Sequence, residues 1–226
     1  MRWQLSGPIP LCAGTLCLEI AEDEIGKIYV GYFGRSPEPE GLNSWLGRLN
    51  TLEGDGLSRG AALNQIANAF ADSGEAQSPF PFLGQSDAVR AEVEAFVNSV
   101  FDKLFNRQAE RAGLDSWADQ IESSIGSSGE AGTRAVIQDI VAGAQNSEVA
   151  LDATTGQNKS QIVLLLADEL DEAGETLDSS AEIETTRDLI ARVTSDEASV
   201  AAARDEIDTF IGQQAGAATS SADLSI

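Results

Sequence analysis

The chain has 226 residues, no histidine, and 37 acidic residues against 14 basic ones, which gives a formal net charge of −23 and a pI near 4.1. Because this charge repels phosphate backbones and anionic lipids, we do not expect nucleic-acid binding. The absence of histidine removes imidazole zinc sites and the Ser-His and Cys-His nucleophile pairs. The two cysteines, Cys12 and Cys17, can close a small disulfide loop or stay as free thiols, and two thiols cannot form a four-thiolate metal site.

Residues 1–23 form an N-terminal segment that we expect to be either irregular or removed by processing. Arg2 precedes an apolar stretch, as in a secretory signal, but the prolines at 8 and 10 interrupt it. We expect no membrane span anywhere, because the strongest apolar run, at 162–167, is far shorter than a bilayer requires.

Residues 24–76 form a first unit of three predicted helices, in which apolar residues recur at helical spacing. The apolar stripes span 25–33, 42–49 and 63–70. A loop at 36–40 separates the first two helices, since its prolines do not fit a helix interior. A glycine-rich link at 54–60 precedes the third.

A linker, residues 77–88, follows the first unit, and we expect Phe80 and Phe82 to hold it against the core. Residues 89–150 then form a second unit with the same order of parts. Its apolar stripes span 93–105, 114–121 and 136–141. A loop at 108–112 and a glycine-rich link at 126–132 separate these helices; the link lacks the lysine of a phosphate-binding loop.

The two units share a sequence signature. Residues 28–35 and 41–45 of the first unit return 72 residues later as 100–107 and 113–117, with the aromatic, Arg, Gly-Leu and Ser-Trp positions in register. The third helices end in similar triplets, at 73–75 and 146–148. Since this period exceeds that of solenoid repeats, we expect two mini-bundles packed together rather than an open array.

Residues 151–213 form a C-terminal helical segment without the signature. We expect a linker at 153–157 and then three helices, over 159–173, 181–193 and 195–213. Ser179 with Glu182, and Thr194 with Glu197, have the spacing of capping boxes. The last two helices carry narrow Val and Ile stripes that suit helix pairing, including pairing between chains. Residues 214–226 are small and polar, and predict a flexible tail.

The predicted fold class is all-α: duplicated three-helix units packed as one helical domain, followed by the C-terminal helical segment. The residues that the signature repeats are our candidate site residues, with a structural role and no catalytic residue among them. They are Tyr29, Phe33, Arg35, Gly41, Leu42 and Trp45 in the first unit, and Phe101, Phe105, Arg107, Gly113, Leu114 and Trp117 in the second.

The repeated arginines and tryptophans each allow two interpretations. An arginine at a helix end can anchor an anionic ligand, but it also complements the helix dipole and can pair with a loop acid such as Glu40 or Glu110, which is the role we favour. A tryptophan can stack on a sugar, but on the apolar stripe of an amphipathic helix it normally belongs to the core. We therefore expect both residue types to be structural.

Acidic residues crowd two places, 19–24 and 168–175. Carboxylates there can supply part of the about six to eight oxygens that calcium prefers, but neither place has the spacing of a calcium loop. No cofactor is thus expected, calcium stays open as an alternative, and metal ligands stay unassigned. Two facing carboxylates can also hydrolyse a polysaccharide, although the sequence indicates no particular pair.

The signature Tyr29-x-x-Tyr32-Phe33-Gly34-Arg35-x-Pro37, with Gly41-Leu42-x-x-Trp45 after it, resembles the bacterial domain of unknown function 4214, and more distantly phycobilisome linker domains. The resemblance covers residues 24–150, and the second copy departs from it at Asn106, Gln108 and Ala109. It implies a secreted or surface-layer protein, often adjacent to haemolysin-type calcium-binding repeats, and offers no catalytic residues to carry over. The ending Ala-Asp-Leu-Ser-Ile, at 222–226, also resembles the C-terminal signal of type I export substrates.

From these observations we expect a secreted or cell-surface bacterial interaction or assembly protein, such as an adhesion or surface-layer-type scaffold, without catalytic activity. Its partner would be a protein, a surface polymer or further copies of the chain. Two alternatives stay open: a carboxylate-based extracellular polysaccharide hydrolase and a calcium-responsive binding module.

Overall fold

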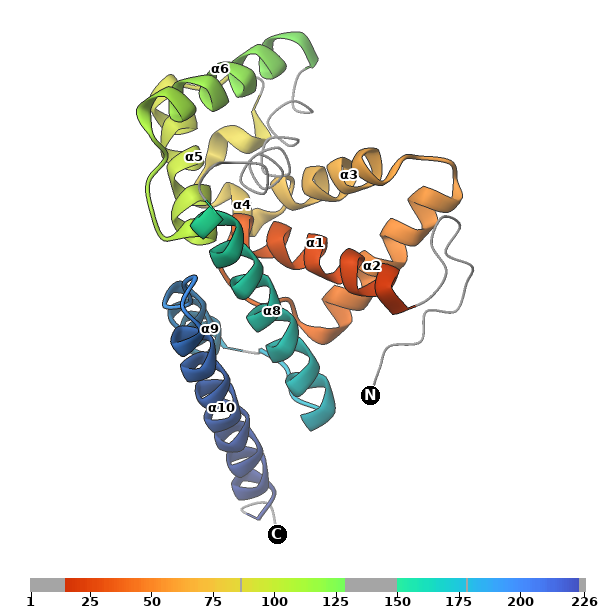
Figure 1. The fold of residues 1–226 in the computed structure, drawn as a ribbon. Helices are drawn as coiled ribbons and strands as arrows, with labels where there is room; N and C mark the ends of the chain where they lie inside the picture. The colour runs from red at the N-terminus through yellow and green to blue at the C-terminus, as the bar shows by residue number, and fades with distance from the viewer. Residues whose placement is uncertain (1–14, 86, 129–149, 178, 224–226) are drawn as a thin grey trace.

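The structure, a computed structural model, describes residues 15–85, 87–128, 150–177 and 179–223 (Figure 1). Over these ranges the chain forms helices and loops with no strand, and the helices pack as one domain, which confirms the all-α prediction. Some predictions lie outside the described residues: the helix at 136–141, the triplet at 146–148 and the side chains of both cysteines.

The first unit consists of α1 (Thr15–Phe33), α2 (Pro39–Gly54), α3 (Arg59–Ala71) and the single-turn α4 (Gly74–Gln77). The start of α2 carries a proline, whose missing N–H is not needed at that position. Ser58 caps α3 by accepting a hydrogen bond from the amide of Ala61, and Ser73 caps α4 in the same way. The three helices predicted for this unit are therefore present, and α4 is an addition.

The second unit begins after a 3-10 turn, η1 (Pro81–Gly84), and contains α5 (Arg90–Phe105) and α6 (Arg111–Ser128). Phe82 is 1% exposed and the ring of Phe80 lies 5.3 Å from that of Phe96, so the predicted anchoring of the linker is confirmed. The glycine-rich link predicted at 126–132 is wrong over 126–128, because α6 continues to Ser128. A glycine lowers helix stability by only about 1 kcal/mol, which neighbouring turns can offset.

The first helices of the two units end in the same unusual backbone conformation. Gly34 follows α1 with φ of +65°, and Asn106 follows α5 with φ of +55°. Glycine adopts this left-handed region without steric cost, and asparagine is among the few other residues that visit it. The two positions are also 72 residues apart, so the duplication extends to the backbone turn that ends each helix.

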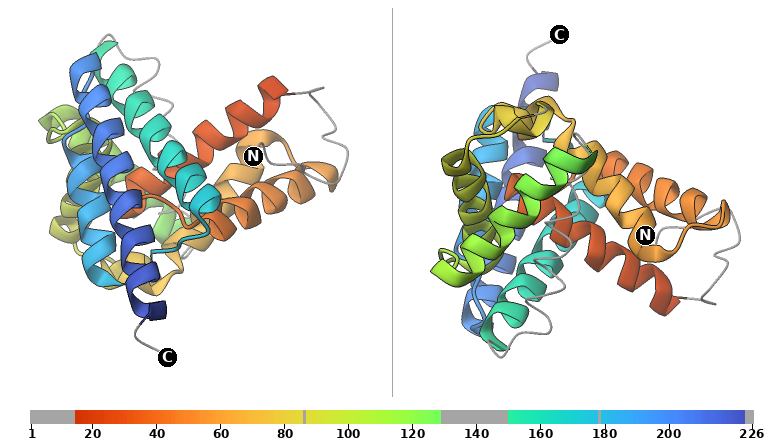
Figure 2. Two further views of the ribbon diagram at one scale, coloured as in Figure 1. Left: turned by 90° about the horizontal axis from the view of Figure 1, so that it is seen from below. Right: turned by 90° about the horizontal axis from the view of Figure 1, so that it is seen from above.

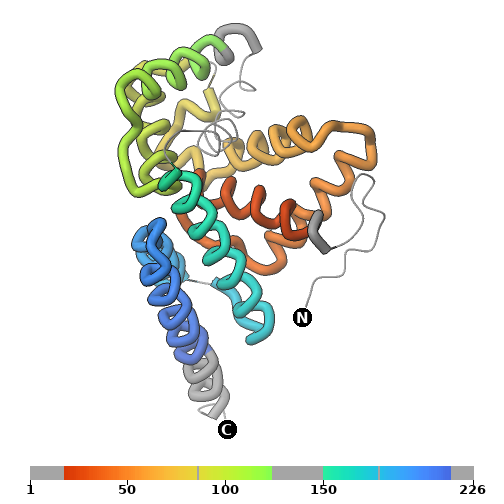
Figure 3. The backbone as a smooth tube through the Cα atoms, in the orientation of Figure 1, coloured from red at the N-terminus to blue at the C-terminus, as the bar shows by residue number. Residues whose placement is uncertain are grey.

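The C-terminal segment consists of α8 (Ala150–Ala173), α9 (Ser180–Ala191) and α10 (Glu197–Asp223), which run alongside one another (Figure 2). The linker predicted at 153–157 is wrong, since these residues lie inside α8. This helix packs against α1, α5 and α10 and passes through the middle of the molecule (Figure 3). It therefore joins the two units rather than leading away from them.

Small residues explain why α8 can lie so close to both units. A Cβ atom at Gly26 of α1 would come within 2.6 Å of the hydroxyl of Ser160, and one at Gly156 within 3.3 Å of the ring of Phe105. These glycines allow α8 to approach the backbone of α1 and the side chains of α5. The residues that suggest a flexible linker are thus part of a helix–helix interface.

Three further boundaries differ from the sequence predictions. Residues 15–23, expected to be irregular or processed, belong to α1. Residues 214–223, expected to be flexible, continue α10. Ser179 and Glu182 form the predicted capping box, but Thr194 and Glu197 do not. At α10 the carboxylate of Asp196 instead accepts the amide of Ala198, because the helix begins two residues later than expected.

The Val and Ile stripes of α9 and α10 face the interior of the chain. Ile190, Val193 and Ile207 are at most 1% exposed, and Val200 packs against the same core. These side chains are occupied within one molecule, so they do not form the free self-association surface that the sequence suggested. Among the described helices, none combines the length and the apolar character needed to cross a membrane.

Candidate functional site

The aromatic residues of the first signature form a cluster around Phe70 of α3. The ring of Phe70 lies 4.8 Å from those of Tyr29 and Trp45, 5.2 Å from that of Phe33 and 5.8 Å from that of Tyr32. The indole of Trp45 donates a hydrogen bond to the hydroxyl of Tyr29 at 3.1 Å. Trp45 is therefore partly buried, with its ring packed against the core and its indole N–H hydrogen-bonded to Tyr29.

The Gly-Leu pair of the signature lies in the first turn of the second helix in each unit, α2 and α6. Leu42 and Leu114 are buried. A Cβ at Gly41 would lie 3.3 Å from the hydroxyl of Tyr29, whereas Gly113 has open space around it. Glycine is thus required by close packing in the first unit only.

The second signature is assembled more loosely. Its two phenylalanines pack edge to face, with the rings of Phe101 and Phe105 5.5 Å apart. Trp117 is half-buried and packs against the common core. The position that matches Tyr29 is Phe101, which has no hydroxyl, so Trp117 lacks the partner that Trp45 has in the first unit.

Arg35 forms the densest set of polar contacts in the first unit. Its Nε and Nη2 atoms each donate to a carboxylate oxygen of Glu75 at 2.8 Å, and Nη1 donates to the carbonyl of Ser36 at 2.8 Å and to Glu38 at 3.1 Å. Burial opposes the charge of Arg35, but the hydrogen bonds and attraction of Glu75 outweigh it and raise the pKa of the arginine. The predicted structural role agrees with these contacts, while the predicted partner, Glu40, is wrong.

Arg107 repeats this pairing with a different acid. Its guanidinium binds both carboxylate oxygens of Asp152 in α8, with Nε 3.0 Å from Oδ1, and lies 5.3 Å from the ring centre of Phe101. The hydrogen bond of Asp152 raises the pKa of Arg107. The predicted partner, Glu110, is not the residue that binds it. Both arginines thus bind an acid beyond their own loops, Glu75 in α4 and Asp152 in α8.

The sequence contained one signal for these partners. Glu75 closes the triplet at the end of the third helix, whose counterpart ends in Glu148. Glu148 lies outside the described residues, and the second partner is Asp152, four positions later. Asp152 lies in the first turn of α8, where the helix dipole also favours a negative charge.

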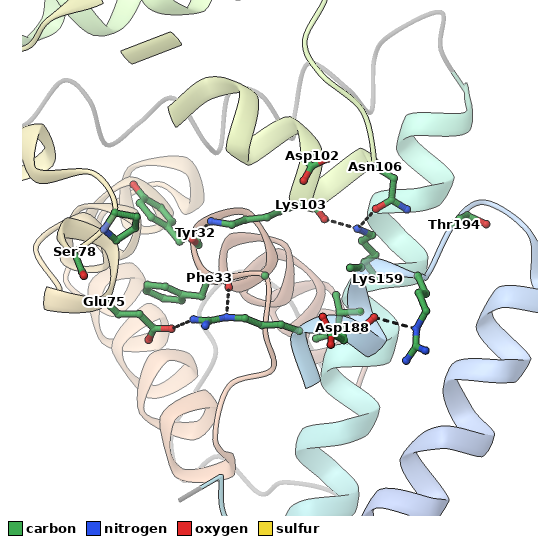
Figure 4. Close-up of a pocket in the computed structure, with 16 residues that line it drawn as sticks. Tyr32, Phe33, Glu75, Ser78, Asp102, Lys103, Asn106, Lys159, Asp188 and Thr194 are labelled. Carbon is green, nitrogen blue, oxygen red and sulfur yellow. Dashed lines mark hydrogen bonds and ion pairs between the residues drawn. The ribbon is translucent and has the colours of Figure 1, made fainter. Parts of the chain in front are cut away.

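A cleft of about 920 Å³ opens where the ends of α1 and α5 meet α4, α8 and α9 (Figure 4). Apolar side chains form part of its wall, including Tyr32, Phe33, Pro79 and Ile190. Its charged lining consists of four cations and three acids: Lys103, Lys159, Arg187, Arg192, Glu75, Asp102 and Asp188. In a chain of net charge −23, this lining is unusual because cations outnumber acids.

Two lysines cap the ends of the first helices inside this cleft. The Nζ atom of Lys103 donates to the carbonyl of Tyr32 in the last turn of α1, at 2.6 Å. The Nζ atom of Lys159 donates to the carbonyl of Lys103 in the last turn of α5 and to the side chain of Asn106, each at 2.6 Å. Carbonyls at a helix end lack intrahelical partners and carry partial negative charge, so each lysine satisfies a group of the helix that it faces.

Arg187 of α9 completes these contacts. It donates to the carbonyl of Phe33 at 3.2 Å and to Glu75 at 2.8 Å, so Glu75 lies between Arg35 and Arg187. Burial raises and the two arginines lower the pKa of Glu75, and the arginines prevail. Glu75 is therefore held ionised and connects the first unit to the C-terminal segment.

Burial lowers the pKa of Lys103 and of Lys159 to about 8. At Lys103 the charge of Arg187 adds to this effect, while Glu75 and Asp102 oppose it. The amines thus exchange protons near neutral pH, unlike an ordinary lysine with a pKa of about 10.4. Amines of this kind can act as nucleophiles or bases, so the cleft contains chemistry that the signature residues do not.

Two of the acidic residues that suggested calcium, both in the first acidic place, are paired with cations. Asp23 binds Lys27 at 2.6 Å and Glu24 lies 3.0 Å from Arg59, which also binds Glu53. Burial raises the pKa of Glu24. Within the described ranges, no group of three or more Cys, Asp or Glu side chains is arranged to hold a metal ion. Calcium binding stays a prediction.

Comparisons with known proteins identify no relative: no protein-family model, no curated protein and no solved structure matches the chain. The resemblance of the signature to the domain of unknown function 4214 therefore stays a prediction.

Proposed function

We propose that the chain is a non-catalytic interaction module of a secreted or cell-surface bacterial protein, in which the duplicated units and α8 form a rigid scaffold around the cleft. The observation that carries this proposal is the internal use of the repeated polar residues. Arg35 binds Glu75, Arg107 binds Asp152, and Trp45 binds Tyr29. These polar groups, which could otherwise bind a ligand, are already engaged in holding the fold together, and the cleft is a concave surface open to a partner.

The charge of the molecule supports an extracellular role. A net charge of −23 favours solubility and disfavours association with nucleic acids and anionic membranes. The partner we propose is accordingly a protein or a surface polymer, bound through a group that enters the cleft.

The test is retention of a partner by the immobilised protein from surface extracts of bacteria. Ala191 lines the cleft and Ala201 lies exposed on α10, so A191W narrows the cleft and A201W is a matched control. We expect the unaltered chain and A201W to retain the same macromolecule and A191W to lose it. Equal retention by A191W would place the partner elsewhere and contradict the role of the cleft.

Self-association needs a separate measurement, because the stripes of α9 and α10 are buried within one chain. Size-exclusion chromatography with light scattering at micromolar protein, with and without calcium, reports it directly. A strict monomer in both conditions would exclude assembly with itself and leave a foreign partner as the proposal. A calcium-dependent rise in mass that persists in high sodium chloride would support the calcium-responsive form of the module, since salt screens only non-specific attraction.

A further inference from the structure

The chain contains three lysines, against eleven arginines. Lys27 is 5% exposed and bound to Asp23, and Lys159 is fully buried with its amine bound to two oxygens. Lys103 is the half-buried one of the three, and its side chain lines the cleft (Figure 4). Among the three lysines, Lys103 is therefore the one whose amine a molecule in the cleft can reach.

The position of Lys103 suits a nucleophile. Its Nζ atom is oriented by the hydrogen bond to the carbonyl of Tyr32 at 2.6 Å and lies 6.0 Å from the ring centre of Phe80. A neutral amine has two N–H groups and a lone pair. One N–H satisfies the carbonyl, and the lone pair cannot bond to a carbonyl oxygen, so it is free to attack an electrophile in the cleft.

The protonation of Lys103 supports this role. Burial, with the charge of Arg187, lowers its pKa to about 8. At pH 7.5 about a quarter of such an amine is neutral, compared with about 0.1% of an ordinary lysine. The population able to react is thus about two hundredfold larger than that of an exposed lysine.

We propose that Lys103 is a covalent capture site for small aldehydes that carry a carboxylate or phosphate group. The lone pair of Nζ attacks the carbonyl carbon and forms a C–N bond. The carbonyl oxygen takes up both amine hydrogens and leaves as water, so the product is an imine with a C=N bond and no redox partner is required. The capture is stoichiometric and reversible, and it goes beyond the proposed scaffold role.

The anionic group is inferred from the charges that face the cleft. Lys159, Arg187 and Arg192 line the cleft together with Lys103, so four cations face three acids there. Of the acids, Asp102 and Asp188 line the same cleft, and Glu75 is already bound between two arginines. The cleft volume of about 920 Å³ accommodates a ring-sized molecule, and the wall of Tyr32 and Phe33 offers it apolar contact. Over the rest of this acidic molecule an anionic aldehyde would be repelled.

The experiment uses pyridoxal phosphate as probe and pyridoxal as the analogue without phosphate. The full chain is incubated with each at pH 7.5, the imine is reduced with borohydride to a stable secondary amine, and the modified residue is identified by peptide mass mapping. We expect the adduct at Lys103, formed at least about tenfold faster than at Lys27 or on a small lysine derivative, since neutral amine is the reacting form. We expect pyridoxal phosphate to react faster than pyridoxal.

Two variants distinguish capture from general reactivity. K103R keeps a cation that can bind the carbonyl of Tyr32 but cannot form this imine, and should lose the adduct with an unchanged circular dichroism spectrum. K27R should keep it. Equal labelling of all three lysines, labelling of Lys159 in place of Lys103, or a rate no greater than that of the lysine derivative would overturn the proposal. Equal rates for the two probes would overturn the requirement for an anionic group.

Discussion

In the first unit the arginine of the signature is buried, whereas in the second it is about a third exposed. The side chain of Arg35 is 9% exposed and that of Arg107 is 32% exposed. Both follow a left-handed residue, Gly34 or Asn106, and both bind a carboxylate with two hydrogen-bonding nitrogens. The same turn and the same two-nitrogen contact therefore occur once with a buried arginine and once with a partly exposed one.

The difference shows what each copy does in the fold. Glu75, the partner of Arg35, belongs to the first unit, so that contact closes the unit on itself. Asp152, the partner of Arg107, belongs to α8, so the second contact joins its unit to the C-terminal segment. The contact of Arg35 with Glu75 stabilises the first unit, and the contact of Arg107 with Asp152 holds the second unit against α8.

Substitution of Phe70 should give the largest difference in stability between equivalent changes in the two units. F70A removes a ring that meets four aromatic neighbours and should cost free energy of unfolding near the top of the about 3–5 kcal/mol range for buried phenylalanines. F105A in the second unit removes one ring pair and should fall near the bottom of that range. Urea titration of both variants measures this; an F105A variant less stable than F70A would refute the assignment of the main core to the first unit.

The arginines should differ next. R35M removes the donor of the buried Ser36 carbonyl, and it removes one of the two arginines that bind Glu75. It should destabilise the fold by about 3 kcal/mol. R107M should cost less, about 1–2 kcal/mol, because Arg107 is partly exposed and the amides of the first turn of α8 still favour the charge of Asp152, although Asp152 itself is buried. The same titration tests both, and equal losses would mean that burial does not set the strength of these contacts.

The cleft lysines predict how stability changes with pH. The folded pKa of Lys103 and Lys159 is about 8, below the unfolded value, so between pH 8 and about 10 the unfolded chain binds more protons. The cost of burying these charges is fully present below pH 8 and is relieved as pH rises. The free energy of unfolding should thus increase by about 3 kcal/mol between pH 8 and about 9.5, about half of it from each lysine.

K103R gives the control for this pH dependence, since arginine stays protonated over the range. Its slope of stability against pH should be shallower than that of the unaltered chain. A stability that falls from pH 8 upwards would contradict the sign. The window stops short of pH 10 because burial raises the pKa of Tyr29, and tyrosine ionisation in the unfolded chain then acts in the opposite direction.

The smallest effect concerns the hydroxyl that the second unit lacks. Y29F removes the acceptor of the Trp45 indole and should cost about 1 kcal/mol. F101Y, the reverse change, offers Trp117 the same partner in a looser setting and should change stability by less than about 0.5 kcal/mol. Thermal unfolding of the two variants compares them, and an F101Y gain as large as the Y29F loss would mean that the copies pack alike.

Much of the fold could be predicted because long apolar stripes determine helices. The stripes of α1, α5 and α10 lie where the sequence places them, and the repeated turn follows from the register of Gly34 and Asn106. The start of α8 could not, because the face that it buries is made of small and polar residues. In the sequence Gly156 and Ser160 suggest a linker, whereas in the fold their small size permits close packing against α1 and α5.

The role of the repeated arginines could be predicted from the sequence, but the cleft could not. The structural role expected for Arg35 agrees with its contacts, since a cation is favourable at the C-terminal end of a helix. Its partner could not be predicted, because it depends on where α4 packs against α1. The cleft could not be anticipated, because its lining comes from five helices and its lysines are isolated in the sequence. A lysine inside an apolar or small-residue stripe, such as Lys159 in α8, is the one signal that could have indicated it.

The central claim is that the repeated signature residues bind each other rather than a ligand, and a pair of double-mutant cycles tests it most directly. Unfolding free energies are measured for R35M, E75Q and their combination, and for R107M, D152N and theirs. We predict a coupling energy of about 1–3 kcal/mol for Arg35 with Glu75, and a smaller one above about 0.5 kcal/mol for Arg107 with Asp152. No coupling in either cycle, with all variants as stable as the unaltered chain, would contradict the claim and leave both arginines free to bind a ligand.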